Sequence, residues 1–153
     1  MKKKVNWKVL ILSLIVVYAV AFIGSFVMMD IVNSSWYENI KPDITPPNYV
    51  FPIVWNILFF LIAISLYLVW IKNKDRKKVV FVYGLNFILN VLWSFLFFNQ
   101  MNVSGAFYEL IVLWFSILGM IYVSWKIDKK ASYLLIPYLL WVTFAGYLNW
   151  LMI

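Results

Sequence analysis

The sequence predicts an all-α integral membrane protein, with a single domain over residues 1–153 that forms a bundle of five transmembrane helices with a long ordered first loop. Hydrophobic residues make up 65% of the chain and charged residues only 12%, whereas soluble proteins average about 25% charged residues. The apolar residues also form five runs, each close to the length of about 20 residues that a helix needs to cross about 30 Å of hydrocarbon. So few charges could not cover a soluble domain, so the bilayer must solvate most of this chain.

Each run has recognisable ends. The first follows an N-terminal lysine cluster, the second follows a proline-rich segment, and the third follows a second basic cluster. The fourth begins after a short polar turn, and the fifth begins after a third basic cluster. The first run is longer than the 7–15 apolar residues of a signal peptide and no clear cleavage site follows it, so we expect it to be retained. The spans are expected at residues 7–29, 52–71, 79–98, 103–125 and 131–153.

Basic residues alternate between the connectors. The first connector holds a single basic residue, Lys41, and the third connector and the C-terminus hold no basic residue. Because basic loops stay in the cytoplasm, we expect a cell-membrane protein with a cytoplasmic N-terminus and an external C-terminus. The net charge of +7 is explained by this orientation, and no nucleic-acid partner is expected. The basic clusters are Lys2, Lys3, Lys4 and Lys8; Lys72, Lys74, Arg76, Lys77 and Lys78; and Lys126, Lys129 and Lys130.

Histidine and cysteine are both absent from the chain. Their absence excludes the usual zinc sites, Ser-His and Cys-His catalysis, and His or Cys ligation of haem iron. We therefore expect neither a metal site nor an obligatory cofactor.

The first connector, residues 30–51, is the only long one. Its prolines restrict their own φ angles and favour extended geometry in the preceding residues, so the segment should be stiff. Long loops in compact folds are often lids or binding loops. Trp36 and Tyr37 are therefore candidates to lie over the helix ends. The alternative is an aromatic belt at the membrane interface.

The third run carries Asn86, Asn90, Trp93 and Phe97 on one helical face, because their spacing is four, three and four residues. Amides are costly in hydrocarbon unless they are paired, so this face should point into the bundle. The alternative role is hydrogen bonding between helices without any ligand.

Aromatic faces recur on the second and fifth runs. Trp55 and Phe59 share a face on the second, and Trp141 lies on one face with Ala145 on the fifth. Small Ala145 beside large Trp141 should leave a concave space between helices. An ordinary aromatic core is the alternative for each residue alone, and the convergence of three such faces favours a ligand pocket.

Glu109 is the only acidic residue well inside a predicted span. A carboxyl group within the membrane is a functional candidate, here for proton coupling. The alternative is contact with interfacial water or capping of the third connector.

The chain resembles the translocator protein family, also called tryptophan-rich sensory proteins or peripheral benzodiazepine receptors. The resemblance covers nearly the whole chain and rests on an ordered set of motifs. These are Trp36-Tyr37, Lys41-Pro42 and Thr45-Pro46-Pro47 leading through Val50-Phe51 to Trp55; Asn86, Asn90 and Trp93; and Pro137-Tyr138-Leu139-Leu140-Trp141, Phe144-Ala145 and Leu148-Asn149.

The resemblance implies a pocket that opens toward the first loop and binds porphyrins (tetrapyrroles, haem included) or isoquinoline and benzodiazepine compounds. It also implies a membrane homodimer. Some bacterial members degrade protoporphyrin in light, which makes Trp55 and Trp141 candidate catalytic electron donors. The ligand-binding residues carried over by position are Tyr37, Pro47, Trp55, Phe59, Asn90, Trp93, Trp141, Ala145 and Leu148.

Two departures from the family pattern matter. The chain ends without the Tyr and Arg of the cholesterol motif of animal members, which makes cholesterol binding doubtful. Position 93 is Trp where other members of the family can carry Phe, which should narrow the pocket or change its stacking surface. The leading hypothesis is a receptor or translocator for tetrapyrroles. The alternatives are light-driven porphyrin oxidation, a small proton-coupled exporter that uses Glu109, and a purely sensory role.

Overall fold

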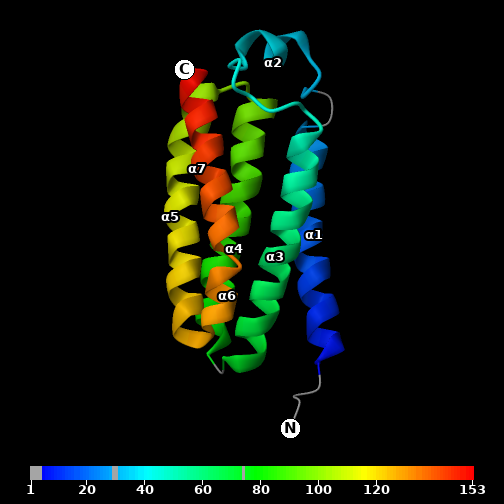
Figure 1. Cartoon of the computed structure of the whole chain (residues 1–153), viewed down its shortest axis with the longest axis vertical. Coiled ribbons are helices and arrows are strands. Elements are labelled where there is room, and N and C mark those ends of the chain that lie inside the picture. Colours follow the sequence, from blue (N-terminus) through cyan, green and yellow to red (C-terminus); the bar gives the residue numbers. More distant parts are fainter. Residues whose placement is uncertain (1–4, 29–30, 74) are drawn as a thin grey trace.

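The computed structural model describes residues 5–28, 31–73 and 75–153. Within these residues five helical spans are long and apolar enough to cross a membrane, which confirms the predicted fold class. A short helix lies in the first connector (Figure 1). The elements are α1 (Trp7–Met28), α2 (Ser35–Ile40), α3 (Val50–Lys72), α4 (Arg76–Ser94), η1 (Phe95–Asn99), α5 (Val103–Ile127), α6 (Lys129–Tyr133) and α7 (Ile136–Leu151).

The first four spans begin and end within a few residues of the expected positions, whereas the fifth span differs more. The expected helix over 131–153 is two helices, α6 and α7, separated at Leu134 and Leu135. Pro137 lies in the first turn of α7, where its missing N–H and its ring prevent an unbroken helix through this point. The expected end of the first span at Met29, and Asp30 after it, lie outside the described residues.

Polarity in the bundle is arranged as membrane solvation requires. Large apolar side chains are exposed all along the outer surface, among them Phe22, Phe81 and Phe115. Many polar side chains within the spans are instead buried, including Asn86, Asn90 and several hydroxyl groups. Hydrocarbon solvates apolar groups and leaves polar groups to find partners inside the protein. The described surface therefore indicates a protein embedded in a bilayer.

The helices pack in a defined order. Helix α1 contacts α3 and α4, while α5 contacts α4, α6 and α7. The close backbone contacts of α3 with the last span are made through α6. At Gly146 in α7 an added Cβ would lie 2.9 Å from Leu110 Cδ2, so α5 and α7 approach closely there. Between α3 and the C-terminal half of α7 lie side chains and a cavity rather than close backbone contacts.

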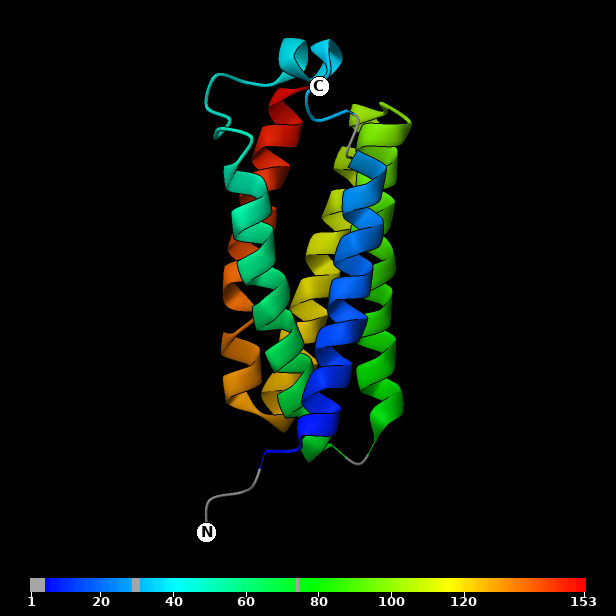
Figure 2. The same ribbon diagram turned by 90° about the vertical axis from the view of Figure 1, so that its right-hand side faces the viewer.

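The two ends of the bundle differ in charge and shape. One end carries the start of α1, the end of α3, the start of α4 and the α5–α6 connection, and the other carries α2 and the C-terminus (Figures 1 and 2). We call them the basic end and the loop end. The described basic residues of the basic end are Lys8, Lys72, Arg76, Lys77, Lys78, Lys126, Lys129 and Lys130, and that of the loop end is Lys41.

An ion pair fastens the basic end. Lys72 Nζ lies 2.6 Å from Asp128 Oδ2, which joins α3 to the connection between α5 and α6. Asp128 Oδ1 also accepts a hydrogen bond from the Lys130 backbone N–H at 3.0 Å. Burial alone would raise the pKa of Asp128, but the hydrogen bonds and positive charges of Lys72 and Lys130 outweigh it and lower that pKa.

Candidate functional site

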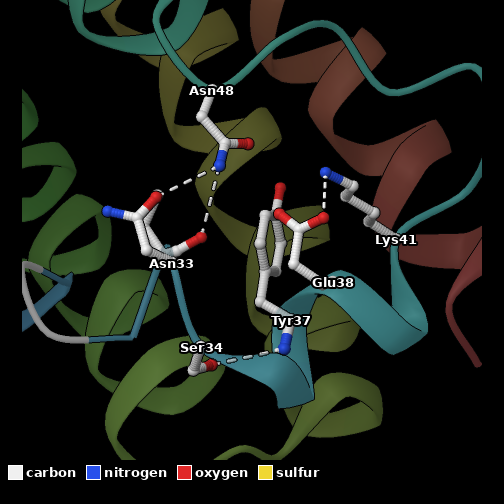
Figure 3. A network of polar contacts seen from close by, with 7 residues as sticks. Asn33, Ser34, Tyr37, Glu38, Lys41 and Asn48 are labelled. Carbon is white, nitrogen blue, oxygen red and sulfur yellow. Dashed lines mark hydrogen bonds and ion pairs between the residues drawn. The ribbon is translucent and has the colours of Figure 1, made fainter.

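The first connector is folded over the loop end. Ser34 caps α2 by accepting a hydrogen bond from the Tyr37 backbone N–H at 3.3 Å. The Asn48 side-chain amide donates to Asn33 Oδ1 and to the Val32 carbonyl, each at 3.4 Å, and so joins the start of the connector to its end (Figure 3). The connector thus forms a cover over this end of the bundle rather than an extended loop.

Tyr37 is the most deeply buried of the described residues of this cover. It is 6% exposed, and its ring packs against Phe97 and Phe98 with centroid separations of 6.3 and 6.1 Å. Burial, and then the charge of Glu38, raise the pKa of Tyr37 above its usual value of 10.0, so the hydroxyl stays neutral. Tyr37 therefore presents an apolar ring and an uncharged donor to the space beneath.

That space is a cavity of about 390 Å³ between α1, α3, α4 and α7, below the first connector. Its volume lies within the range of about 300–1,000 Å³ that is usual for small-molecule sites. The lining is mainly apolar and aromatic, with a few amides and hydroxyls. The lining residues are Ala21, Gly24, Ser25, Met28, Val32, Asn33, Tyr37, Asn48, Phe51, Pro52, Trp55, Phe59, Asn90, Trp93, Ser94, Phe97, Phe98, Ala145, Leu148, Asn149 and Met152.

Two stacked aromatic pairs form much of the wall. Trp55 and Phe59 on α3 lie 5.3 Å apart between ring centroids with an interplanar angle of 28°. Trp93 on α4 stacks on Phe97 at 5.3 Å and 24°. Such pairs form extended flat surfaces, which favour ligands with flat π systems.

A chain of hydrogen bonds fixes the side chain of Asn90 in the cavity wall. Asn90 Nδ2 donates to the Tyr138 hydroxyl at 3.1 Å, and that hydroxyl donates to Asn86 Oδ1 at 3.3 Å. Asn86 Nδ2 in turn donates to Ser116 Oγ at 2.8 Å. Hydrogen bonding between helices, the alternative role for these amides, is therefore present. The Asn90 Oδ1 has no hydrogen-bond partner among the described residues, so it remains an acceptor for a ligand.

Trp93 is held in place by a second chain. Its indole Nε1 donates to Asn149 Oδ1 at 3.2 Å, and Asn149 Nδ2 donates to the Val103 carbonyl at 2.9 Å. Helices α4, α5 and α7 are linked through these two bonds. The stacking surface of Trp93 is therefore pre-organised, which lowers the entropic cost of binding.

The π-helical turn η1 shapes the outer part of the cavity. It follows α4 directly and buries two consecutive aromatic side chains, Phe97 at 2% and Phe98 at 5% exposure. Both side chains line the cavity. Phe97 was expected from its spacing, whereas nothing in the sequence pattern indicated Phe98.

The structure brings together most of the site residues that the sequence predicted. Pro47 and Trp141 are not among the lining residues. Pro47 is exposed in the connector, and Trp141 packs against Phe51 at 5.7 Å and Phe144 at 5.6 Å. The predicted residues that line the cavity are Tyr37, Trp55, Phe59, Asn90, Trp93, Ala145 and Leu148.

Helix α1 contributes a wall that sequence reasoning missed. Ala21, Gly24 and Ser25 line the cavity, and an added Cβ at Gly24 would lie 3.6 Å from Ser94 Oγ on α4. Helix α1 is apolar on all sides, so hydrophobic periodicity could not distinguish its inward face. Sequence reasoning also missed Asn33 and Asn48, because they line the cavity only when the connector folds back and brings them together.

Two charged groups lie outside this lining. Lys41 pairs with Glu38 at 2.6 Å on the surface of the cover, and this hydrogen bond and positive charge lower the pKa of Glu38 (Figure 3). Glu109 on α5 is 8% exposed, and neither carboxyl oxygen has a hydrogen-bond partner in the described residues. Those residues also contain no cluster of three or more acidic side chains suited to a metal ion.

The five apolar spans and the covered aromatic cavity define a membrane-embedded protein with a candidate small-molecule site. Residues 12–153 match the model of the TspO/MBR family. The chain belongs to the TspO/MBR family.

Three relatives illustrate the breadth of that family. The chain is 41% identical to the tryptophan-rich protein TspO of Archaeoglobus fulgidus over 92% of each chain. It is 29% identical to the tryptophan-rich sensory protein of Cereibacter sphaeroides, over 94% of this chain and 89% of that relative. It is also 29% identical to the translocator protein of Ovis aries, over 76% of this chain and 72% of that relative.

Proposed function

We propose that the protein binds porphyrins and related tetrapyrroles in the cavity beneath the first connector. The observation that carries this proposal is the pair of stacked surfaces, Trp55–Phe59 and Trp93–Phe97, on the wall of one apolar cavity. A tetrapyrrole offers large π faces, and each aromatic contact contributes about 0.5–1.5 kcal/mol beyond burial. Flat isoquinoline and benzodiazepine compounds present similar faces and should compete for the same space.

Binding should depend on the flat ring rather than on a central metal. The chain has no His or Cys to ligate iron. Free-base protoporphyrin IX and haem should therefore bind with comparable affinity. A preference for haem of about 100-fold, which corresponds to about 2.7 kcal/mol, would contradict the proposed mode of recognition.

Quenching of tryptophan fluorescence by protoporphyrin IX in the dark tests the proposal. Retention of porphyrin absorbance after gel filtration excludes optical artefacts. Trp93→Phe removes the larger stacking ring and the bond to Asn149, so it should weaken binding about tenfold, or about 1.4 kcal/mol.

Trp141→Phe provides the matched control for this titration, because Trp141 is an indole of the same bundle that does not line the cavity. Saturable binding that Trp93→Phe weakens and Trp141→Phe leaves within about twofold would support the proposal. Absent binding, or equal effects of both substitutions, would contradict it.

Light-driven oxidation of the bound porphyrin is a second candidate activity, and the position of Trp55 in the cavity wall favours it. The excited porphyrin would take an electron from Trp55, and the resulting porphyrin radical anion would react with dioxygen. The Trp55 radical would then take an electron back from the oxygenated porphyrin, so that the porphyrin is the net electron donor and dioxygen the net oxidant. Illumination of the complex should therefore bleach the porphyrin in air but not under argon. Trp55→Phe should slow the bleaching at equal bound porphyrin. Loss that persists under argon would contradict an oxidative route.

Proton-coupled export is a third candidate, and the buried, unpartnered carboxyl of Glu109 favours it. In proteoliposomes, Glu109→Gln should abolish proton-dependent movement of porphyrin and leave dark binding unchanged. Transport that Glu109→Gln does not alter would exclude this role.

We further propose a location in the cell membrane, with the basic end in the cytoplasm, and a homodimer. The charge asymmetry of the two ends supports the orientation. The resemblance in sequence motivates the dimer, which crosslinking in native membranes would test. Loss of the dimer on dilution in lipid would contradict it.

A further inference from the structure

We propose that the basic end carries a binding site for an anionic phospholipid, separate from the aromatic cavity. The site is a groove of about 350 Å³ between α1, α3 and α4. One acyl chain would lie in the groove, and the negatively charged headgroup would contact basic side chains at its mouth.

The groove is open to the side and closed at its floor. Leu66 on α3 and Tyr83 on α4 form the floor and are 8% and 2% exposed. Leu12 and Val16 on α1, and Val80 on α4, form exposed rims. A buried apolar floor between lipid-facing rims is accessible from the hydrocarbon, so a lipid chain can enter it without crossing water.

Gly84 leaves room in the middle of the groove. It lines the groove from α4, and a Cβ added there would meet no atom within 4 Å. A larger residue at this position would occupy the space of the acyl chain. The groove therefore exists partly because this position lacks a side chain.

The depth of the groove matches one leaflet. On α1 it extends from Lys8 to Val16, about 12 Å at about 1.5 Å per residue. Half of the hydrocarbon core is about 15 Å thick. An acyl chain anchored at the mouth would therefore lie within the leaflet of the basic end.

The mouth of the groove is positively charged. Lys8 lines it from α1, and Arg76 precedes Val80 and Gly84 at intervals of four residues on α4. The Arg76 guanidinium lies over the Trp70 ring at 5.0 Å, and Trp70 also lines the groove. The acidic residue nearest in sequence is Asp75, which Lys77 and Lys78 outnumber. A phosphate group complements this charge, and basic pockets between helices on the cytoplasmic side recognise such headgroups.

Native mass spectrometry with phosphatidylglycerol and phosphatidylcholine of equal chain length tests the site. Wild type should retain phosphatidylglycerol at least about fivefold more strongly, since each basic side chain near an anionic headgroup contributes about fivefold. The double variant Lys8→Gln/Arg76→Gln should reduce this preference below about twofold. Gly84→Leu should abolish retention of both lipids by filling the groove. Soluble glycerol phosphate at equal concentration should not displace the lipid, because it lacks the acyl chain.

Two control variants separate the groove from general features of the basic end. Lys126→Gln/Lys129→Gln removes two charges from the same end outside the groove, and Gly119→Leu enlarges another glycine that has no atom within 4 Å of its added Cβ. Both controls should keep the wild-type preference. Equal losses in the controls, no preference in wild type, or unchanged retention in Gly84→Leu would overturn the proposal. Dark porphyrin titration of Gly84→Leu checks folding independently and should match wild type.

Discussion

At the scale of single residues, the buried amides perform two tasks at once. Asn86 and Asn90 share the Tyr138 hydroxyl, which accepts from one amide and donates to the other. An unpaired amide in a membrane interior is costly, so this hydroxyl stabilises both side chains. The same bonds fix the rotamer of Asn90 in the cavity wall. Helix packing, and the porphyrin binding that we propose, should therefore both depend on Tyr138.

Removal of that hydroxyl should affect both properties. We expect Tyr138→Phe to lower the free energy of unfolding by about 1 kcal/mol and to weaken porphyrin binding severalfold. Thermal unfolding in detergent and the dark titration measure the two effects. Tyr122→Phe, at an exposed position, is the control. Unchanged stability and affinity in Tyr138→Phe would show that the hydrogen-bond chain has no energetic role.

At the scale of elements, the distance between neighbouring helices determines where the cavity forms. Helices α5 and α7 meet at Gly146, beside Leu110, whereas α3 and α7 are separated by aromatic side chains and the cavity. The break between α6 and α7, just before Pro137, lets the last span contact α3 near the basic end and α5 further along. The last span thus packs against α3 in the basic-end half of the bundle and lines the cavity in the loop-end half.

Substitutions at Gly146 should show a graded response. Gly146→Ala places a Cβ against the flexible end of Leu110, which can rotate away, so stability should change little. Gly146→Leu should lower the free energy of unfolding by about 1–3 kcal/mol, because the two helices must separate. Thermal unfolding with equal detergent and lipid checks the order. A leucine variant as stable as wild type would contradict the close approach.

The connection between α5 and α6 should respond to acid. The folded pKa of Asp128 is lowered, so its ion pair with Lys72 stabilises the protein above the unfolded pKa and is lost as the pH falls through the folded value. We expect wild type to lose stability below about pH 4, and Asp128→Asn to be less stable at pH 7 and less sensitive to this change. Unfolding temperatures between pH 3 and pH 7 measure this difference. Asp43→Asn, at an exposed loop position, should follow the wild-type profile.

At the scale of the whole molecule, the charge asymmetry predicts the orientation. The chain contains no cysteine, so a single introduced cysteine is a clean reporter. With the basic end in the cytoplasm, Asp43→Cys should react with a membrane-impermeant maleimide added to intact cells, and Lys77→Cys should react only after lysis. The reverse pattern would contradict the orientation. Equal labelling of both sites in intact cells would indicate mixed insertion.

The sequence alone determined the five membrane spans and identified most of the aromatic residues that line the cavity, because both depend on local composition and helical spacing. Trp55 with Phe59, and Asn90 with Trp93, could be placed on shared faces by counting residues. Only the tertiary structure decided that α1 supplies a cavity wall and that Phe98 of η1 lines the cavity. Only it placed Trp141 and Pro47 outside the lining. These features depend on how separate helices rotate and pack against each other, and that rotation is set by contacts between distant residues rather than by the pattern within one helix.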